Sequence, residues 1–215
     1  AFEGHFLIGT AVNRYQVSGA DPQAMPFIAK QFNSLTAEDA MKWERIHPEP
    51  GRYEFGLADS IVSFAKSNGM PVIGHVLVWH SQTPDWVFQD SLGYPLTRDA
   101  LLERLHDHIN TVMGHYRGQI LGWDVVNEAV NEDGTLRQTK WLEIIGEDYI
   151  EKAFIFAREA DPDAELYYND YNNEEPAKRA GVIAIVKDLQ AKGIRIDGVG
   201  IQGHWHLDSP DMKTV

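Results

Sequence analysis

The chain has 215 residues, of which 43% are hydrophobic and 24% charged, a composition typical of one folded domain with a sizeable core. Its formal net charge of -13 at pH 7 would repel a polyanion, which argues against nucleic acid and anionic membrane surfaces as partners. The absence of cysteine excludes disulfides, thiol catalysis and thiolate metal sites, and leaves open whether the protein is secreted or intracellular.

Short apolar segments alternate along the chain with longer segments of helical period, and each apolar segment ends at polar or aromatic residues. No hairpin dipeptide joins neighbouring apolar segments, so we expect parallel strands linked by right-handed crossovers, hence an α/β fold. The predicted strands are residues 6–13, 33–39, 71–79, 120–128, 164–170 and 196–205.

Three predicted helices have recognisable ends. One runs from Phe55 to Ser67, and another from Pro176 to Gly193. The third follows Thr97 as its N-cap. In two of these helices, apolar residues at helical spacing form a stripe that we expect to face the core. In the helix after Thr97 they are Leu101, Leu105, Ile109, Val112 and Tyr116, and in the helix after Pro176 they are Ile183, Val186 and Leu189. His106 and His108 cannot share a helix face, so we expect both on the solvated surface.

Polar side chains follow the end of every predicted strand, and this distribution decides between two α/β architectures. An open doubly wound sheet gathers its ligand at one switch point, whereas a closed eight-stranded barrel directs all strand ends to one mouth. No glycine-rich phosphate loop follows the first strand, which weakens the nucleotide-binding alternative. We therefore predict a (β/α)8 TIM barrel, of which this chain supplies roughly strands 1–6.

The residues at the predicted mouth suggest a carbohydrate ligand. Five tryptophans lie near strand ends, where they either fill the core or stack on sugar rings: Trp43, Trp79, Trp86, Trp123 and Trp205. Histidines at His75, His204 and His206 make a metal site conceivable, but neutral histidines that bind a ligand or a carboxylate explain the pattern as well. We therefore expect no metal.

Glu128 ends the apolar run of WDVVNEA, where a carboxylate should cost stability. Strand alternation puts Asp124 and Glu128 on one side, with Glu128 at the mouth. A salt-bridged structural role is one reading. The functional reading is general acid catalysis, because a partly desolvated carboxyl can keep the proton that a departing glycosidic oxygen needs.

Five motifs, in order and spacing, closely resemble the glycoside hydrolase family 10 endo-1,4-β-xylanases: TAEDAMKWE (36–44), GHVLVWHSQTPDW (74–86), WDVVNEA (123–129), YYNDYN (167–172) and GIQGHWH (200–206). The resemblance spans nearly the whole chain. It implies an eight-stranded β/α barrel that hydrolyses internal xylan linkages with retention of configuration. It also implies that xylan and xylo-oligosaccharides are the substrates and that the chemistry needs no cofactor.

The resemblance also assigns roles to residues. Glu128 matches the acid/base, and Asn127 the neighbour that holds the sugar's 2-hydroxyl. The remaining matches are distal sugar contacts at Glu38 and Lys42, glycone-side contacts at His75, Trp79 and Gln82, residues near the scissile sugar and the nucleophile at Gln202 and His204, and leaving-group-side residues at Asn169 and Tyr171.

Two departures from the family pattern stand out. Asp39 occupies a sugar-binding position where members usually carry Asn, which removes a hydrogen-bond donor. The nucleophile Glu of the seventh strand and the eighth strand have no counterpart in residues 1–215. We therefore expect a single catalytic barrel domain over residues 1–215, incomplete at its C-terminus, that needs a complementing chain or segment carrying the last two β/α units. Alone, it should aggregate or stay partly unfolded.

Three other functions stay open from the residues. A cellulase or mixed-linkage glucanase would share Asn127 and Glu128 but would have to accommodate a hydroxymethyl group on each sugar. A metal-dependent hydrolase would use His75, His204 and His206. A noncatalytic xylan-binding fragment would bind xylo-oligosaccharides without turnover.

Overall fold

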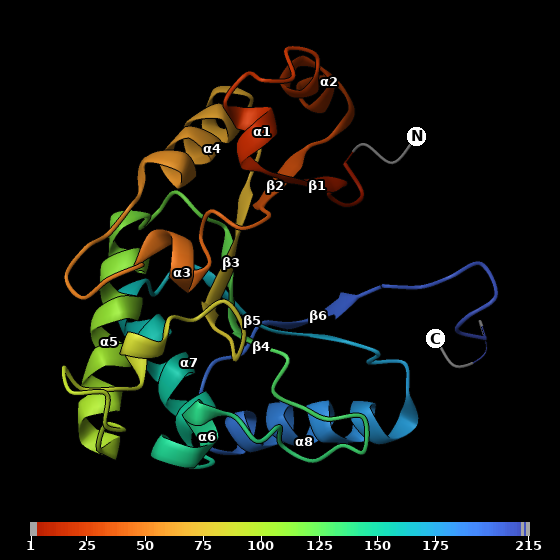
Figure 1. Ribbon diagram of the computed structural model, residues 1–215. Helices are drawn as coiled ribbons and strands as arrows, with labels where there is room; N and C mark the ends of the chain where they lie inside the picture. Colours follow the sequence, from red (N-terminus) through yellow and green to blue (C-terminus); the bar gives the residue numbers. More distant parts are fainter. Residues whose placement is uncertain (1–3, 212, 214–215) are drawn as a thin grey trace.

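The computed structural model describes residues 4–211 and 213, and these contain one six-stranded sheet. All neighbouring strands are parallel, and their order follows the chain. The strands are β1 (Gly9–Val12), β2 (Ser34–Ala37), β3 (Val72–Val78), β4 (Gly122–Asn127), β5 (Glu165–Tyr171) and β6 (Gly198–Gln202). The predicted parallel α/β fold is confirmed, and the sheet forms an open part of a (β/α)8 barrel (Figure 1).

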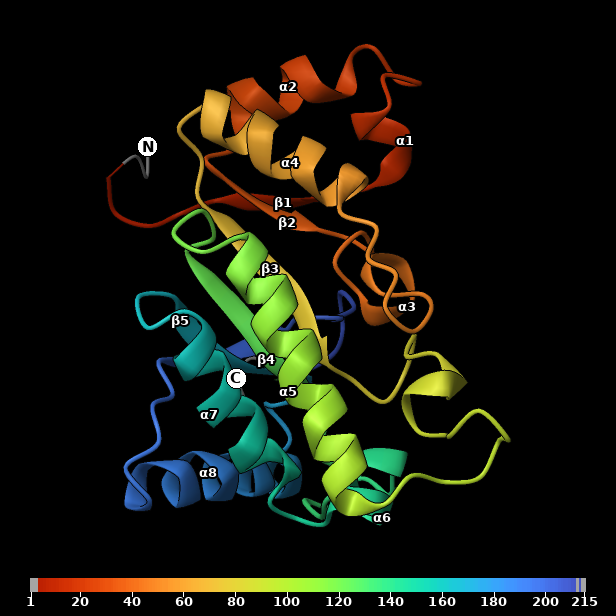
Figure 2. The same ribbon diagram turned by 90° about the vertical axis from the view of Figure 1, so that its left-hand side faces the viewer.

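Helices connect successive strands and cover the outer face of the sheet. Three of the longer ones, α4, α5 and α7, lie over this face in Figure 2, whereas β6 extends from the opposite side in Figure 1. The helices are α1 (Arg14–Val17), α2 (Ala24–Gln31), α3 (Trp43–Ile46), α4 (Gly56–Ser67), α5 (Arg98–His115), α6 (Lys140–Ile145), α7 (Tyr149–Ala160) and α8 (Pro176–Ala191). None of the helices among the described residues is long and apolar enough to cross a membrane.

The strands at the two ends of the sheet are shorter than the sequence predicts. The strand expected at residues 6–13 begins only at Gly9, and the one expected at 196–205 ends at Gln202. Within the described residues β1 pairs only with β2, and β6 only with β5. Because each of these strands has a partner on one side, apolar side chains near them stay exposed: Phe6, Leu7, Ile8, Val199 and Ile201.

The core lies between the central strands and their helices. All five predicted stripe residues after Thr97 are buried, as expected. The predicted stripe of α8 is partly wrong: Leu189 is buried as expected, but Ile183 is exposed and Val186 is only partly buried, whereas Lys178 and Val182 are buried. The buried positions 178, 182 and 189 still follow helical spacing, but the buried face includes a lysine that the apolar pattern does not reveal.

The five tryptophans divide between core and mouth. Trp43 and Trp123 are buried core residues, and Trp123 packs so tightly against Gly74 on β3 that a Cβ there would lie 2.2 Å from the indole ring. Trp79 and Trp86 are partly buried, and Trp205 is exposed. Trp43 and Trp123 are therefore unavailable to a sugar.

The expectation that both His106 and His108 lie in solvent is wrong for His108. Since residues two apart face different sides of α5, His108 turns inward, where it is fully buried and stacks on Trp43 at 3.5 Å between ring centroids. Its Nδ1 lies 3.1 Å from Nδ1 of His47, so one ring donates and the other accepts. Two neutral histidines thus form a buried pair in the aromatic core.

Acidification should destabilise the protein through this pair. Burial lowers the pKa of His47 from 6.5 to about 4 and that of His108 well below 6.5. As the pH falls, the unfolded chain therefore takes up these protons before the folded protein does. The stability that the neutral pair contributes is fully present above pH 6.5 and is lost as the pH falls towards 4. His47 alone contributes a loss of about 3 kcal/mol across this window. Urea unfolding at a series of pH values between 7.5 and 4.5 measures this loss of unfolding free energy.

His47→Gln is the matched variant, because it removes one titrating ring and keeps a polar side chain. We expect its unfolding free energy to fall less steeply between pH 6.5 and 4 than that of the parent protein, because its unfolding takes up close to one proton fewer. Parallel curves for the two proteins would contradict the prediction.

Candidate active site

Glu128 follows β4 directly and adopts a left-handed backbone conformation, with φ of 56°. Its amide N–H donates to the carbonyl oxygen of Asn169 on β5 at 2.9 Å. Its carboxylate accepts two hydrogen bonds, from Trp79 Nε1 at 2.9 Å and from Gln202 Nε2 at 3.2 Å. Side chains from the ends of β3 and β6 thus hold the two carboxylate oxygens, and the carboxyl group is only partly buried.

Asn127 and Gln202 connect the end of β4 to the end of β6. Gln202 Nε2 donates to Asn127 Oδ1 at 3.0 Å, and Gln202 Oε1 lies 3.1 Å from Nε2 of the exposed His204. Among the described residues, Nδ2 of the buried Asn127 has no hydrogen-bond partner. A buried donor without a partner costs free energy, so this amide is available to a ligand hydroxyl beside Glu128.

A second group of side chains lies within the sheet next to Glu128. His75 Nδ1 on β3 lies 2.8 Å from Asp124 Oδ2 on β4, and Asn169 Nδ2 on β5 donates to the same oxygen at 3.3 Å. Register explains the contact, since Asp124 pairs with His75 and Asn127 with Asn169 across the parallel ladders. Three neighbouring strands therefore bring polar side chains together on one face of the sheet.

Lys42 extends the site towards the first two strands. Its Nζ donates to Gln82 Oε1 at 2.8 Å and lies 5.2 Å from the centroid of the Trp79 ring. Gln82 Nε2 in turn donates to Glu44 Oε1 at 3.0 Å. The ammonium therefore connects β2 to the indole that holds Glu128.

Glu38 and Asp39 lie at the far end of the same edge. Glu38 Oε2 accepts from Asn13 Nδ2 at 3.0 Å, and Asp39 Oδ2 lies 3.7 Å from Arg45 Nε. Asp39 Oδ1 is buried and has no hydrogen-bond partner within the described residues. Asn13 and Asp39 also line an open cavity of about 350 Å³. There is room beside Asp39 for part of a ligand.

Tyr171 lies on the other side of Glu128 and reaches it through Arg137. The Tyr171 hydroxyl oxygen accepts from an Arg137 Nη2–H at 2.9 Å, and Arg137 Nε donates to the carbonyl oxygen of Glu128 at 2.9 Å. Sequence reasoning missed Arg137, because it lies in an irregular loop without a motif. The structure thus brings the predicted site residues to one edge of the sheet.

The three histidines of the metal alternative serve separate contacts. His75 contacts Asp124, His204 contacts Gln202, and His206 pairs with Ser209 in a turn after β6. Among residues 4–211 and 213, no three His, Cys, Asp or Glu side chains gather in a geometry that could hold a metal ion.

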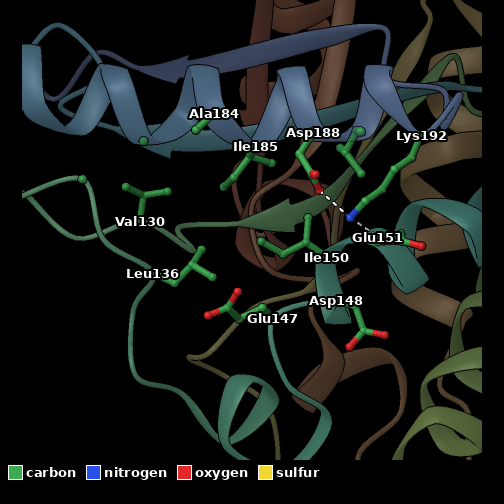
Figure 3. A pocket seen from close by; sticks show the side chains of 13 residues that line it. Val130, Leu136, Glu147, Asp148, Ile150, Glu151, Ala184, Ile185, Asp188 and Lys192 are labelled. Carbon is green, nitrogen blue, oxygen red and sulfur yellow. Dashed lines mark hydrogen bonds and ion pairs between the residues drawn. The ribbon is translucent and has the colours of Figure 1, made fainter.

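A cavity of about 520 Å³ lies between α7, α8 and the loop after β4 (Figure 3). Apolar side chains such as Val130, Leu136 and Ile185 line it. The acidic groups at its rim are mostly paired: Lys192 Nζ lies 2.8 Å from Asp188 and 2.9 Å from Glu151. Its lining therefore lacks the converging polar groups that surround Glu128.

Comparison with known proteins gives a consistent picture. The family model described as Glycosyl hydrolase family 10 matches residues 1–215. Endo-1,4-beta-xylanase A of Xylanibacter ruminicola is 50% identical over 209 residues, which cover 97% of this chain and 57% of that protein. The Beta-1,4-xylanase of Dictyoglomus thermophilum is 50% identical over 216 residues, which cover 100% of this chain and 58% of its own length.

Solved structures agree with the sequence comparisons. A GH10 endoxylanase retrieved from a sugarcane soil metagenome has a TM-score of 0.96 at 42% identity over 99% of this chain and 62% of its own. An intracellular xylanase of Thermoanaerobacterium saccharolyticum, solved as a mutant in complex with xylotriose, has a TM-score of 0.94 at 45% identity, covering 99% and 68%. This chain thus spans about three fifths of the curated relatives' length.

Proposed function

The chain belongs to glycosyl hydrolase family 10, and from this premise we propose that it supplies the proton donor and most sugar contacts of a retaining endo-1,4-β-xylanase. The observation that carries the proposal is the Glu128 carboxylate, which Trp79 and Gln202 hold at the C-terminal ends of the strands. Relatives named as xylanases, and the xylotriose bound to one solved relative, support xylan as the substrate class.

Glu128 acts first as the general acid. Its proton passes to the glycosidic oxygen while a second carboxylate attacks the anomeric carbon, and the leaving sugar departs as an alcohol. Glu128 then removes a proton from the water that releases the glycosyl intermediate, which restores both carboxyl groups and retains the configuration. No metal or organic cofactor takes part in these steps.

The neighbouring side chains bind the sugar chain on either side of Glu128. Nδ2 of Asn127 has no hydrogen-bond partner among the residues that the structure describes, which supports its contact with the 2-hydroxyl of the scissile sugar. Glycone contacts extend along the edge towards β1, and Asn169 and Tyr171 lie on the leaving-group side. The glycone contacts are Glu38, Asp39, Lys42, His75, Trp79 and Gln82, with Gln202 and His204 next to the nucleophile.

The second carboxylate comes from a complementing segment or chain that carries the last two β/α units. Two observations support this part of the proposal: β1 and β6 each have one partner strand within the described residues, and apolar side chains beside them are exposed. Added strands would cover these edges. We use the term complete barrel for this chain together with those units.

Hydrolysis of xylan by the complete barrel tests the proposal. NMR should show that the first products keep the β-configuration. Their release should depend on Glu128. Release from cellulose at an equal rate would favour a glucanase instead.

Asp39→Asn should improve glycone binding in the complete barrel. The amide supplies the donor that family members usually present here, and it replaces a carboxylate whose buried Oδ1 has no hydrogen-bond partner within the described residues. One added hydrogen bond of about 1 kcal/mol corresponds to roughly a 5-fold lower KM for xylo-oligosaccharides, with kcat unchanged, because ground state and transition state gain equally. Asp39→Ala is the control and should raise KM. An unchanged or higher KM for the Asn variant would contradict the prediction.

A further inference from the structure

Lys178, in the first turn of α8, has a fully buried side chain although it carries a charge. Its Nζ lies 3.0 Å from Oδ1 of Asp170, whose side chain is also fully buried, and 3.1 Å from Oε1 of the exposed Glu132. The same ammonium lies 3.4 Å from the centroid of the Tyr171 ring. A buried charge persists only where it is paired and hydrogen-bonded, and this one is held by two carboxylates and an aromatic face.

Hydrogen bonds connect Asp170 to the backbone next to Glu128. Its Oδ2 accepts from the Tyr168 hydroxyl at 2.5 Å, and its Oδ1 accepts from the amide N–H of Tyr171 at 2.9 Å. The Tyr168 oxygen in turn accepts from the amide N–H of Ala129 at 2.9 Å. Ala129 directly follows Glu128, so a buried chain of contacts runs from Lys178 through Asp170 and Tyr168 to the peptide of the proposed proton donor.

Glu128 requires such support, because its φ of 56° lies in the left-handed region that side-chain-bearing residues rarely adopt. Strained backbone of this kind persists when several hydrogen bonds determine it together. Three such bonds hold the backbone at this point: the Glu128 N–H donates to Asn169, the Glu128 carbonyl oxygen accepts from Arg137, and the Ala129 N–H donates to Tyr168. Arg137 also contacts Tyr171, whose ring lies against Lys178.

We infer that Lys178 is a positioning residue for catalysis, which fixes the carboxyl group of Glu128 through the buried chain Asp170, Tyr168 and Ala129. The inference rests on the proposed role of Glu128 as the proton donor. Lys178 contacts no sugar in this scheme. Without its ammonium, Asp170 would be a buried carboxylate lacking its counter-charge, and its bond to Tyr168 would rearrange. The peptide after Glu128 would then shift, and misplacement of a catalytic group by about 1 Å lowers rates strongly.

The test is Lys178→Met in the complete barrel, with aryl xylobiosides of different leaving groups. The value of kcat/KM reports the first bond cleavage, which needs a proton from Glu128 when phenol leaves and needs none when dinitrophenol leaves. We expect kcat/KM to fall about 10-fold for the phenyl substrate and less than about 2-fold for the dinitrophenyl substrate. A purely structural role for Lys178 would lower both values equally.

Two further variants keep the test decisive. Tyr168→Phe removes only the hydroxyl that links Asp170 to Ala129, and it should show the same leaving-group dependence even if Lys178→Met fails to fold. Lys192→Met is the matched control: this lysine follows the other end of α8, is exposed and pairs with Glu151 and Asp188. We expect it to leave both rates unchanged.

The outcomes separate this inference from the proposed function. If Glu128→Gln impairs the phenyl substrate selectively while folded Lys178→Met and Tyr168→Phe retain normal rates, or lose rate equally on both substrates, the inference is overturned and Glu128 keeps its role. If Glu128→Gln itself leaves the phenyl substrate unaffected, the proposed function fails, and the inference fails with it.

Discussion

Glu128→Gln in the complete barrel should lower kcat/KM on xylan by roughly 10² to 10⁴-fold, the range that a positioned general acid contributes. The substitution removes the transferable proton and little else. Gln has nearly the same shape and keeps one oxygen that can accept from Trp79 Nε1 or from Gln202 Nε2. Losing one of these two bonds should cost about 1 kcal/mol of unfolding free energy. Reducing-sugar release and thermal unfolding measure the two effects.

The matched control for this variant is Glu165→Gln. Glu165 begins β5, so it lies at the opposite end of a strand next to β4, and its carboxylate accepts from the Tyr167 hydroxyl. Its exchange should leave xylan hydrolysis unchanged. Unchanged rates for Glu128→Gln, or equal losses for the two variants, would remove the assignment of Glu128.

A polypeptide limited to residues 1–215 should hydrolyse almost no xylan, and a complementing segment with the last two β/α units should restore the activity. Double displacement needs two carboxyl groups about 5 to 5.5 Å apart, and Glu128 supplies only one of them. The added strands would also cover apolar side chains at the two ends of the sheet, such as Ile8 and Ile201. Xylan hydrolysis and size-exclusion chromatography, with and without the segment, measure activity and aggregation.

The control is a segment in which the nucleophile Glu is replaced by Gln. It should reduce aggregation as well as the unmodified segment does, yet restore no hydrolysis, which separates barrel closure from chemistry. Residues 1–215 alone cleaving xylan at the complemented rate would contradict the requirement for a second carboxylate.

Much of the fold could be predicted because its signals are local. Mostly apolar runs such as the one from Val72 to Val78 identified strands of the sheet, and helical spacing identified the buried face of α5. Two predictions about buried faces were wrong, because a side chain's partner inside the fold is not visible in its local pattern. His108 was expected to face water, yet it is fully buried against His47 and Trp43. Ile183 was expected to be buried, yet it is exposed, and the same helix buries Lys178, whose ammonium pairs with Asp170.

The sequence by itself determined that polar residues end every strand, and its motifs singled out Glu128 together with the side chains proposed to bind sugar. Only the tertiary structure decided which of these residues touch. Trp79 reaches Glu128 across 49 residues of chain, and Gln202 reaches it across 74. The support beneath Glu128, from Lys178 and Arg137, likewise belongs to the tertiary structure. The physical reason is that periodicity records which face of an element is buried, whereas hydrogen-bond partners depend on the register between strands and on how loops fold back over their ends.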